Sequence, residues 1–255
     1  MKFAHIADTH IKNLKYHKEY KAVFQQLYQT LRDQKVDYII HCGDIAHTKT
    51  QISPEFVELC SDFLKNLADI APTYVILGNH DGNLRNSYRQ DAITPIVDAL
   101  GQENLHLLKY AGETHLDDKF CLNTLSVFDE DNWVKPSNPD KINIGLYHGA
   151  IKYSRTDIGF VMEHGDHGVD IFDDCDYSML GDIHKTQILN KEGTIAYAGS
   201  TIQQNFGETQ DKGMFIWDIK SKTEFTREKF NFVNPKPFVT INLTKSGRIP
   251  KGFKC

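Results

Sequence analysis

Five short apolar segments of this chain are each followed, directly or after one glycine, by aspartate, asparagine or histidine. The motifs are Asp8-Thr9-His10, Gly43-Asp44, Gly78-Asn79-His80-Asp81, His148-Gly149 and Gly181-Asp182-Ile183-His184. Carboxylate, imidazole and amide ligands without any thiolate suit Mn, Fe or Zn. One such residue alone is ordinary in a loop, but these motifs offer too many candidate ligands for a single ion. The residue types therefore favour two ions that share a bridging carboxylate.

The elements before these motifs must bring them together. Apolar runs alternate with helical patterns early in the chain, which is typical of a layered α/β fold. In such sheets, ligands bind in the crevice beyond the carboxyl ends of the strands. The glycines before Asp44, Asn79 and Asp182 permit sharp turns where a side chain must point back at an ion. We therefore expect one cluster at one edge of the sheet.

The pattern predicts helices over residues 19–32, 54–67 and 91–100, with Ser53 as the N-cap and Pro54 in the first turn of the second helix. Glu192-Gly193 is typical of a hairpin turn. The predicted strands are 3–7, 38–40, 73–77, 105–108, 120–128, 142–147, 177–180, 187–190, 194–198, 214–219, 223–229 and 238–243.

Taken in order, the motifs resemble the signature of the calcineurin-like metallophosphoesterases. Two further stretches, Asp44-Ile45-Ala46-His47 and Tyr197-Ala198-Gly199-Ser200-Thr201 with Phe206-Gly207-Glu208, are similar to SbcD-type DNA repair exonuclease subunits. Those are relatives of the meiotic-recombination nuclease and of the phage recombination nuclease subunit. The resemblance covers about residues 1–243. It implies a layered α-β-β-α sandwich, in which two mixed sheets are flanked by helices.

The resemblance also implies roles for individual residues. The ligands of one ion would be Asp8, His10, Asp44 and His184. Those of the other would be Asp44, Asn79, His148 and Asp182, so that Asp44 bridges the two ions. His80 would stabilise the transition state or protonate the leaving oxygen, Asp81 would orient His80, and His47 would lie near the scissile phosphate.

One position departs from the family pattern. Most members have G-H-x-H where this chain has Gly181-Asp182-Ile183-His184. Because aspartate is shorter than histidine and anionic, this change favours Mn or Mg over Zn, or weakens the second site.

The function that the resemblance implies is an Mn-dependent DNA nuclease, an exonuclease or a single-strand endonuclease, in recombination and double-strand-break repair. Its implied partners are DNA, an SMC-like ATPase subunit of the SbcC type and a second copy of the chain. An alternative is a phosphoesterase for small molecules or phosphoproteins. Against the phosphoprotein version, protein phosphatases of this superfamily have an arginine directly after this aspartate, and this chain does not have one after Asp44. A second alternative is a non-catalytic module that docks DNA or the ATPase.

Composition sets outer limits on these hypotheses. The chain has 255 residues, 40% apolar and 25% charged, which fits one large domain or a domain plus a fragment. Its apolar runs are far shorter than the ~20 residues of a membrane-spanning helix, and Asp8 interrupts any signal-peptide core. Five widely spaced cysteines indicate neither a disulfide framework nor a thiolate zinc site. We expect a reduced, cytoplasmic protein without a membrane partner.

Charge is unevenly distributed along the chain. The net charge is -5, yet residues 219–255 hold nine Lys and Arg against Glu224 and Glu228. An acidic body does not hold nucleic acid by bulk electrostatics alone, and bound divalent cations would change that balance. We expect a nuclease domain over residues 1–232. Residues 233–255 would be a basic tail or the start of a truncated DNA-capping domain.

Overall fold

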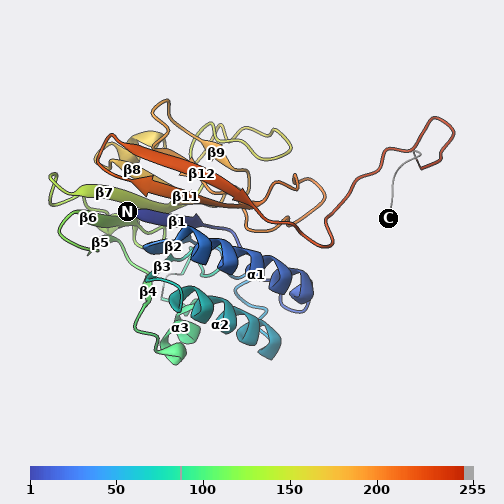
Figure 1. Ribbon diagram of the computed structural model, residues 1–255, viewed down its shortest axis with the longest axis horizontal. Helices are drawn as coiled ribbons and strands as arrows, with labels where there is room; N and C mark the ends of the chain where they lie inside the picture. The colour runs from blue at the N-terminus through green and yellow to red at the C-terminus, as the bar shows by residue number, and fades with distance from the viewer. Residues whose placement is uncertain (87, 250–255) are drawn as a thin grey trace.

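Two six-stranded sheets stacked face to face form the body of the protein (Figure 1). The computed structural model describes residues 1–86 and 88–249. Two shared features explain the stacking: strand side chains alternate between the two faces of each sheet, and both faces of the central strands are apolar. On β1 (Lys2–Ile6), Phe3 faces the second sheet while Ala4 and Ile6 face the helices.

The first sheet has the strand order β12-β11-β1-β2-β3-β4. Its first four strands along the chain are parallel, and β11 and β12 add antiparallel pairs at one side. The bounds of the strands after β1 are β2 (Tyr38–Cys42), β3 (Thr73–Ile76), β4 (Leu105–Leu108), β11 (Gly213–Ile219) and β12 (Phe225–Asn231).

The second sheet has the order β5-β6-β7-β8-β10-β9. Its central strands β6, β7, β8 and β10 are parallel, and antiparallel strands close both edges. The bounds are β5 (Gly112–His115), β6 (Phe120–Leu125), β7 (Ile142–His148), β8 (Tyr177–Gly181), β9 (Gln187–Ile188) and β10 (Ile195–Tyr197).

The helices α1 (His17–Gln34), α2 (Pro54–Ala68) and α3 (Thr94–Leu100) cover the outer face of the first sheet (Figure 1). As predicted, the Ser53 hydroxyl caps α2 by accepting a hydrogen bond from the Phe56 amide at 3.2 Å. Phe24 and Phe63 stack between α1 and α2 with their ring centroids 4.3 Å apart. The apolar residues of α1 and α2, which recur at helical spacing, form the buried faces of these helices.

Loops and two 3-10 helices, η1 (Glu130–Asn132) and η2 (Val169–Phe172), pack near the outer face of the second sheet. Tyr147, Tyr197 and Phe172 form a separate buried cluster there. The predicted fold class, two mixed sheets flanked by helices, is therefore confirmed. The long helices lie on the first sheet, and the connections between strands do most of the covering on the second.

Some predicted elements were wrong. Residues 238–243 form no strand, because this segment reaches no neighbouring strand and its Phe238 instead packs against Tyr16 and Phe206. Strand β5 was missed because Gly112–His115 lacks β-branched and apolar residues apart from Thr114. Helix α3 begins at Thr94 and not at Asp91, whose carboxylate instead accepts hydrogen bonds from the amides of Ile93 and Thr94.

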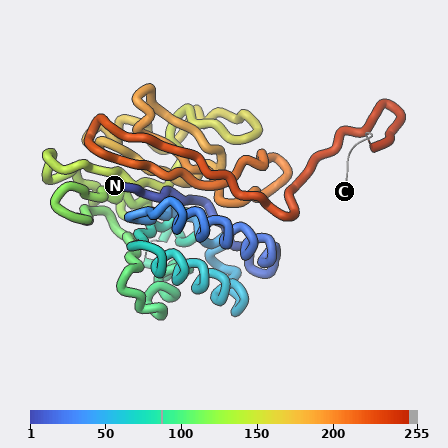
Figure 2. Tube along the Cα trace, in the orientation of Figure 1, coloured from blue at the N-terminus to red at the C-terminus, as the bar shows by residue number. Residues whose placement is uncertain are grey.

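The end of the chain leads away from the body (Figure 2). Residues 232–249 contain no helix or strand. Part of the predicted basic tail, Lys251, Lys254 and Cys255, lies outside the described residues. No helix within residues 1–86 and 88–249 is long and apolar enough to cross a membrane.

Candidate metal centre

The predicted motifs meet where the carboxyl ends of strands from both sheets converge. Loops after β1 and β2 run side by side there: the Asp8 amide donates to the Gly43 carbonyl at 3.1 Å, and the His10 amide to the Asp44 carbonyl at 2.9 Å. The loop after β8 joins them, since the Asp182 amide donates to both carboxylate oxygens of Asp8 at 3.0 and 3.1 Å. Motifs up to 174 residues apart thus share one site.

Backbone strain is concentrated in this cluster. Asp8, His10, Asp44 and Asp182 all have positive φ, at 50°, 48°, 56° and 99°. Non-glycine residues rarely adopt this conformation, and it costs roughly 1–3 kcal/mol per residue where it is maintained. Four candidate ligands in this conformation indicate that the surrounding structure holds them for a purpose other than stability.

Glycines allow the loops to approach this closely. Gly43 has φ +85°, and a Cβ there would lie 2.4 Å from His148 Nδ1. A Cβ on Gly78 would lie 2.2 Å from the Asp44 carboxylate. The glycine before Asp44 thus serves a turn, as predicted, whereas Gly78 gives Asp44 the space that its side chain occupies.

The first group of candidate ligands is Asp8, His10 and His184, whose ligand atoms lie within 4.8 Å of one another. The Nε2 atoms of His10 and His184 are 2.9 Å apart. His10 Nε2 is also 3.9 Å from Asp8 Oδ1 and 3.5 Å from Asp44 Oδ2. Together with Asp44, these are the residues that the resemblance assigned to one ion.

The second group is Asp8, Asp44 and His148, again within 4.8 Å. His148 Nε2 is 3.3 Å from Asp44 Oδ2 and 3.9 Å from Asp182 Oδ1. Because Asp44 Oδ2 lies near both His10 and His148, Asp44 occupies the position expected of a bridging ligand.

The donor atoms fit metal ions. His148 Nδ1 donates to the Cys42 carbonyl at 2.7 Å and His184 Nδ1 to the Glu208 carboxylate at 2.7 Å, which turns each Nε2 lone pair into the cluster. His148 Nε2 and Asn79 Oδ1 are buried without a hydrogen-bond partner. Both atoms belong to predicted ligands of the second ion, so a cation bound there would give each of them a partner.

The electrostatics of the cluster point the same way. Burial raises the pKa of Asp8 to about 7 and also raises the pKa of Asp182. Burial likewise opposes ionisation of Asp44, but the nearby imidazoles of His148 and His10 hold its pKa well below the usual value. Burial opposes protonation of His148, yet the Asp44 carboxylate keeps its pKa well above the usual value. Three crowded carboxylates thus favour a compensating positive charge.

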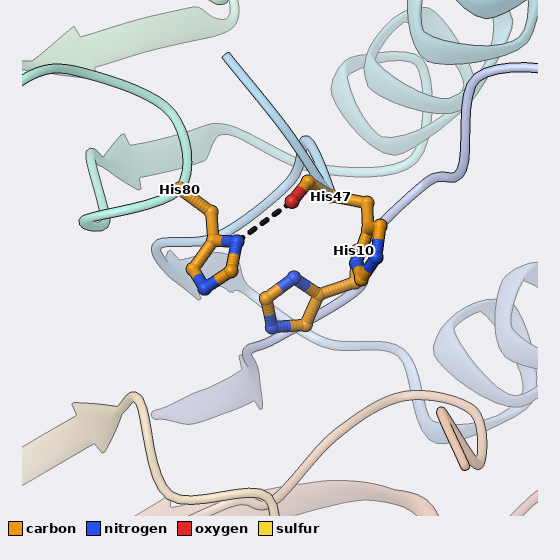
Figure 3. A group of neighbouring side chains, drawn as sticks. All are labelled: His10, His47 and His80. Atoms are coloured by element: carbon orange, nitrogen blue, oxygen red, sulfur yellow. Dashed lines mark hydrogen bonds between the residues drawn. The ribbon is translucent and has the colours of Figure 1, made fainter. Parts of the chain in front are cut away.

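A third group brings His10, His47 and His80 together (Figure 3). The His10 ring centroid is 4.7 Å from that of His80 and 5.6 Å from that of His47. Both residues predicted to act on the substrate are therefore beside a candidate ligand.

The prediction that Asp81 orients His80 was wrong. The His80 ring donates from Nδ1 to the His47 carbonyl at 2.6 Å (Figure 3). Asp81 instead accepts backbone hydrogen bonds from Asp44 and Gly78 through Oδ2 and from Ala46 through Oδ1, at 2.8 to 2.9 Å. Its completely buried carboxylate ties the loop after β2 to the loop after β3, and so positions Asp44.

The roles of three further residues became apparent only in the structure. Glu208 orients His184, and the buried Lys212 ammonium lies 3.3 Å from Glu208 Oε2. Lys49 donates to the carbonyls of Asn79 and Gly82 at 2.9 and 2.8 Å, which steadies the loop that carries His80. Glu208 stood in a motif noted from the sequence, but the motif did not say which histidine it contacts.

Comparison with known proteins places the chain in a family. The family model for calcineurin-like phosphoesterases matches residues 1–198. An uncharacterized protein, R555 of Acanthamoeba polyphaga mimivirus, is 38% identical over 234 residues, covering 86% of this chain and 17% of the viral protein. The DNA double-strand break repair protein Mre11 of Methanosarcina acetivorans is 23% identical over 233 residues, covering 85% of this chain and 36% of the archaeal protein.

The chain therefore spans well under half the length of both relatives. Among solved structures, GAP50 of Plasmodium, described as an anchor in the inner membrane complex, shares the fold with a TM-score of 0.50 at 13% identity, over 98% of this chain and 99% of that one. Together with the strand-end cluster, the family match over most of the chain shows that the protein belongs to the calcineurin-like phosphoesterases, a family of hydrolases that use divalent metal ions.

Proposed function

We propose that the chain is a two-metal-dependent DNA nuclease of the SbcD type that hydrolyses phosphodiesters as an exonuclease, a single-strand endonuclease or both. One observation carries the proposal: residues of the metal cluster line two different cavities. The His10 ring is close to both His80 and His184, with centroid distances of 4.7 and 4.8 Å. His80 lines one cavity and His184 the other.

Each cavity also carries basic side chains. The cavity of about 520 Å³ at His80 includes Lys49 and Arg85, and the cavity of about 400 Å³ at His184 includes Lys185 beside the carboxylates of Asp157, Asp182 and Glu208. A phosphodiester within a polymer must extend beyond the reacting phosphate in two directions, whereas a phosphomonoester extends in one. Two openings with cationic groups therefore favour a polymeric phosphodiester.

The roles of the residues follow from their positions. Bound ions would supply an activated water and neutralise charge on the phosphate. Asp8, His10, Asp44 and His184 would hold one ion, and Asp44, Asn79, His148 and Asp182 the other. Because His80 Nδ1 is engaged by the His47 carbonyl, Nε2 is left for the substrate, where it would stabilise the transition state or protonate the leaving oxygen.

Mn is the metal we propose, because Asp182 adds an anionic oxygen ligand to the second site and the cluster contains no thiolate. The similarity to the archaeal Mre11 protein supports DNA as the substrate and recombination and double-strand-break repair as the setting. On the same basis, we propose that the chain works in the cytoplasm with an SMC-like ATPase subunit of the SbcC type and as a homodimer. Sedimentation equilibrium at several concentrations tests the dimer.

Cleavage of end-labelled linear duplex and single-stranded DNA tests the nuclease, with Mn, Mg or EDTA present. We expect Mn-dependent cleavage by the wild type, and a loss of about 10²- to 10⁴-fold in His80→Ala if His80 acts as an acid or electrostatic catalyst. A wild type that leaves both DNAs intact with Mn but hydrolyses a chromogenic phosphomonoester would overturn the proposal.

A further inference from the structure

We propose that the cavity beside His184 binds an unpaired base next to the scissile phosphate, so that the substrate is single-stranded DNA. This inference rests on the proposed nuclease function and deepens it. The cavity has a volume of about 400 Å³, which is within the usual range for a small-molecule site. It shares Asp182 and His184 with the metal cluster, so a substrate bound at the metals extends directly into it.

Three apolar side chains form one part of the wall of this cavity, and the carboxylates of Asp157, Asp182 and Glu208 line the side toward the metal cluster. Ile158 and Phe160 come from the loop between β7 and η2, and Ile183 lies between the two candidate ligands of the β8 loop. Ile158 is 76% exposed and Phe160 is 61% exposed, so each carries apolar surface that no other part of the described chain covers. An uncovered phenylalanine ring at a phosphoester site is suited to stack on a nucleobase.

The loop that carries these walls is held firmly against the metal centre. The buried Lys212 ammonium pairs with Asp157 at 2.5 Å and also donates to the His184 carbonyl at 2.9 Å. On the other side of the loop, the Arg155 amide donates to Gln187 Oε1 at 3.0 Å, and Gln187 Nε2 donates back to the Arg155 carbonyl at 2.9 Å. The cavity is therefore formed before any ligand binds, which lowers the entropic cost of binding.

Charge beyond the cavity identifies its occupant. A second cavity of about 630 Å³ shares Lys185 with the first and adds Lys152 and Arg155, against one acidic residue, Asp170. A pocket with an exposed apolar and aromatic wall, followed by three cations, matches a base followed by the phosphates of a strand. A small apolar ligand would not contact the three cations, and a phosphomonoester would not extend into the second cavity.

The strand must be unpaired at this point. A base in a duplex is stacked and paired, and its partner would have to enter the same space. Only a base that has been flipped out, or one in a single strand, can present its face to Phe160. Single-stranded DNA avoids the cost of unpairing, so it is the preferred substrate in this inference.

Binding in EDTA tests the inference without catalysis. The probe is a fluorescent oligothymidylate, compared by anisotropy with an abasic oligonucleotide of equal length and charge. We expect wild type to bind the oligothymidylate about tenfold more tightly than the abasic strand, and Phe160→Ala to remove that preference. Phe160→Leu, which keeps apolar volume without the aromatic face, should lose most of it. Tyr110→Ala is the matched control, because Tyr110 is 62% exposed and lines none of these cavities.

Equal binding of both oligonucleotides by the wild type, or equal behaviour of Phe160→Ala and Tyr110→Ala, overturns the inference. So does a wild type that binds neither strand. These outcomes are distinct from failure of the proposed function, which is a wild type that binds the bases but cleaves no DNA with Mn.

A second measurement tests the path of the strand. Lys152→Ala should weaken binding of both oligonucleotides equally and reduce the salt dependence of binding, because it removes one phosphate contact but no base contact. An unchanged salt dependence would place the strand outside the second cavity and contradict the argument from charge.

Discussion

Individual histidines in this centre are oriented by groups that are not themselves ligands. The Cys42 carbonyl orients His148, the His47 carbonyl orients His80 and the Glu208 carboxylate orients His184. Two of the three acceptors are backbone carbonyls, which any residue type supplies. Replacing the side chain at Cys42 or His47 would therefore leave the orienting carbonyl oxygen in place. Replacing Glu208 would remove the carboxylate that orients His184.

Glu208→Ala should lower the affinity for Mn by about 10- to 100-fold, which is typical for loss of a group that orients a metal-binding histidine. Glu208→Gln keeps an acceptor for His184 Nδ1 and should retain part of the affinity. Isothermal titration with Mn measures both, and Glu192→Ala, at the exposed hairpin turn, is the control. Wild-type affinity in Glu208→Ala would show that His184 holds its orientation without this contact.

Asp81→Asn should destabilise the fold as well as the site. The substitution replaces an acceptor of backbone hydrogen bonds with an amide, whose NH₂ group must face a backbone N–H. We expect a loss of about 1–3 kcal/mol in the free energy of unfolding, measured with urea, together with weaker Mn binding. A variant with unchanged stability and Mn affinity but a lower turnover number would instead restore the role of orienting His80.

At the scale of elements, the candidate metal ligands follow the ends of strands, and the loops after those strands hold the ligands in position. The ends of β1, β2 and β3 supply Asp8, Asp44 and Asn79 from the first sheet, and β7 and β8 supply His148 and Asp182 from the second. Within each sheet, these residues could be predicted to meet because the carboxyl ends of parallel strands lie at one edge, and the stacking of the two sheets brings the two edges together. Prediction did less well for the short helix α3, whose start depends on a side chain outside the helix.

Asp91 lies just before that helix, and its carboxylate should make the free energy of unfolding depend on pH. Its carboxylate accepts from the amides of Ile93 and Thr94 and from Lys109 Nζ, at 2.7 to 2.9 Å. Burial opposes ionisation of Asp91, but these donors, Lys109 foremost, hold its pKa below the usual value. A carboxyl with a lowered pKa stabilises the fold above its unfolded pKa of about 3.9 and loses this contribution as pH falls through the folded pKa.

Urea unfolding of wild type and Asp91→Asn from pH 7 to pH 3 measures this contribution. We expect wild type to be more stable by about 1–3 kcal/mol at pH 7, with the difference shrinking once the pH falls below about 4. A difference that stays constant over this range would mean that the charge of Asp91 contributes nothing.

For the whole molecule, the acidic charge of the body and the strained ligand loops predict that bound cations stabilise the fold. Ions that bind only the folded state stabilise it by about 2.7 kcal/mol per site at a hundredfold excess over Kd, and each kcal/mol raises Tm by roughly 2–4 °C in a protein of this size. Saturating Mn should therefore raise Tm by roughly 5 °C or more relative to EDTA.

Scanning calorimetry measures the shift, with Asp44→Asn as the comparison. Because Asp44 lies near both groups of ligands, this variant should lose most of the stabilisation by Mn. An equal shift in Asp44→Asn and wild type would locate the stabilising ions elsewhere on the molecule.

The sequence by itself determined a layered α/β fold and the set of candidate ligands, because periodicity defines the strands and parallel topology brings their ends together. The arrangement as two stacked mixed sheets was implied by the family resemblance. Only the tertiary structure decided that Asp81 binds backbone amides, that His47 acts on His80 through its carbonyl, and that Phe160 stands beside His184. These contacts join backbone atoms and loops that are distant along the chain. Because nearly every residue has the same backbone groups, the residue types do not indicate which backbone groups will form these contacts.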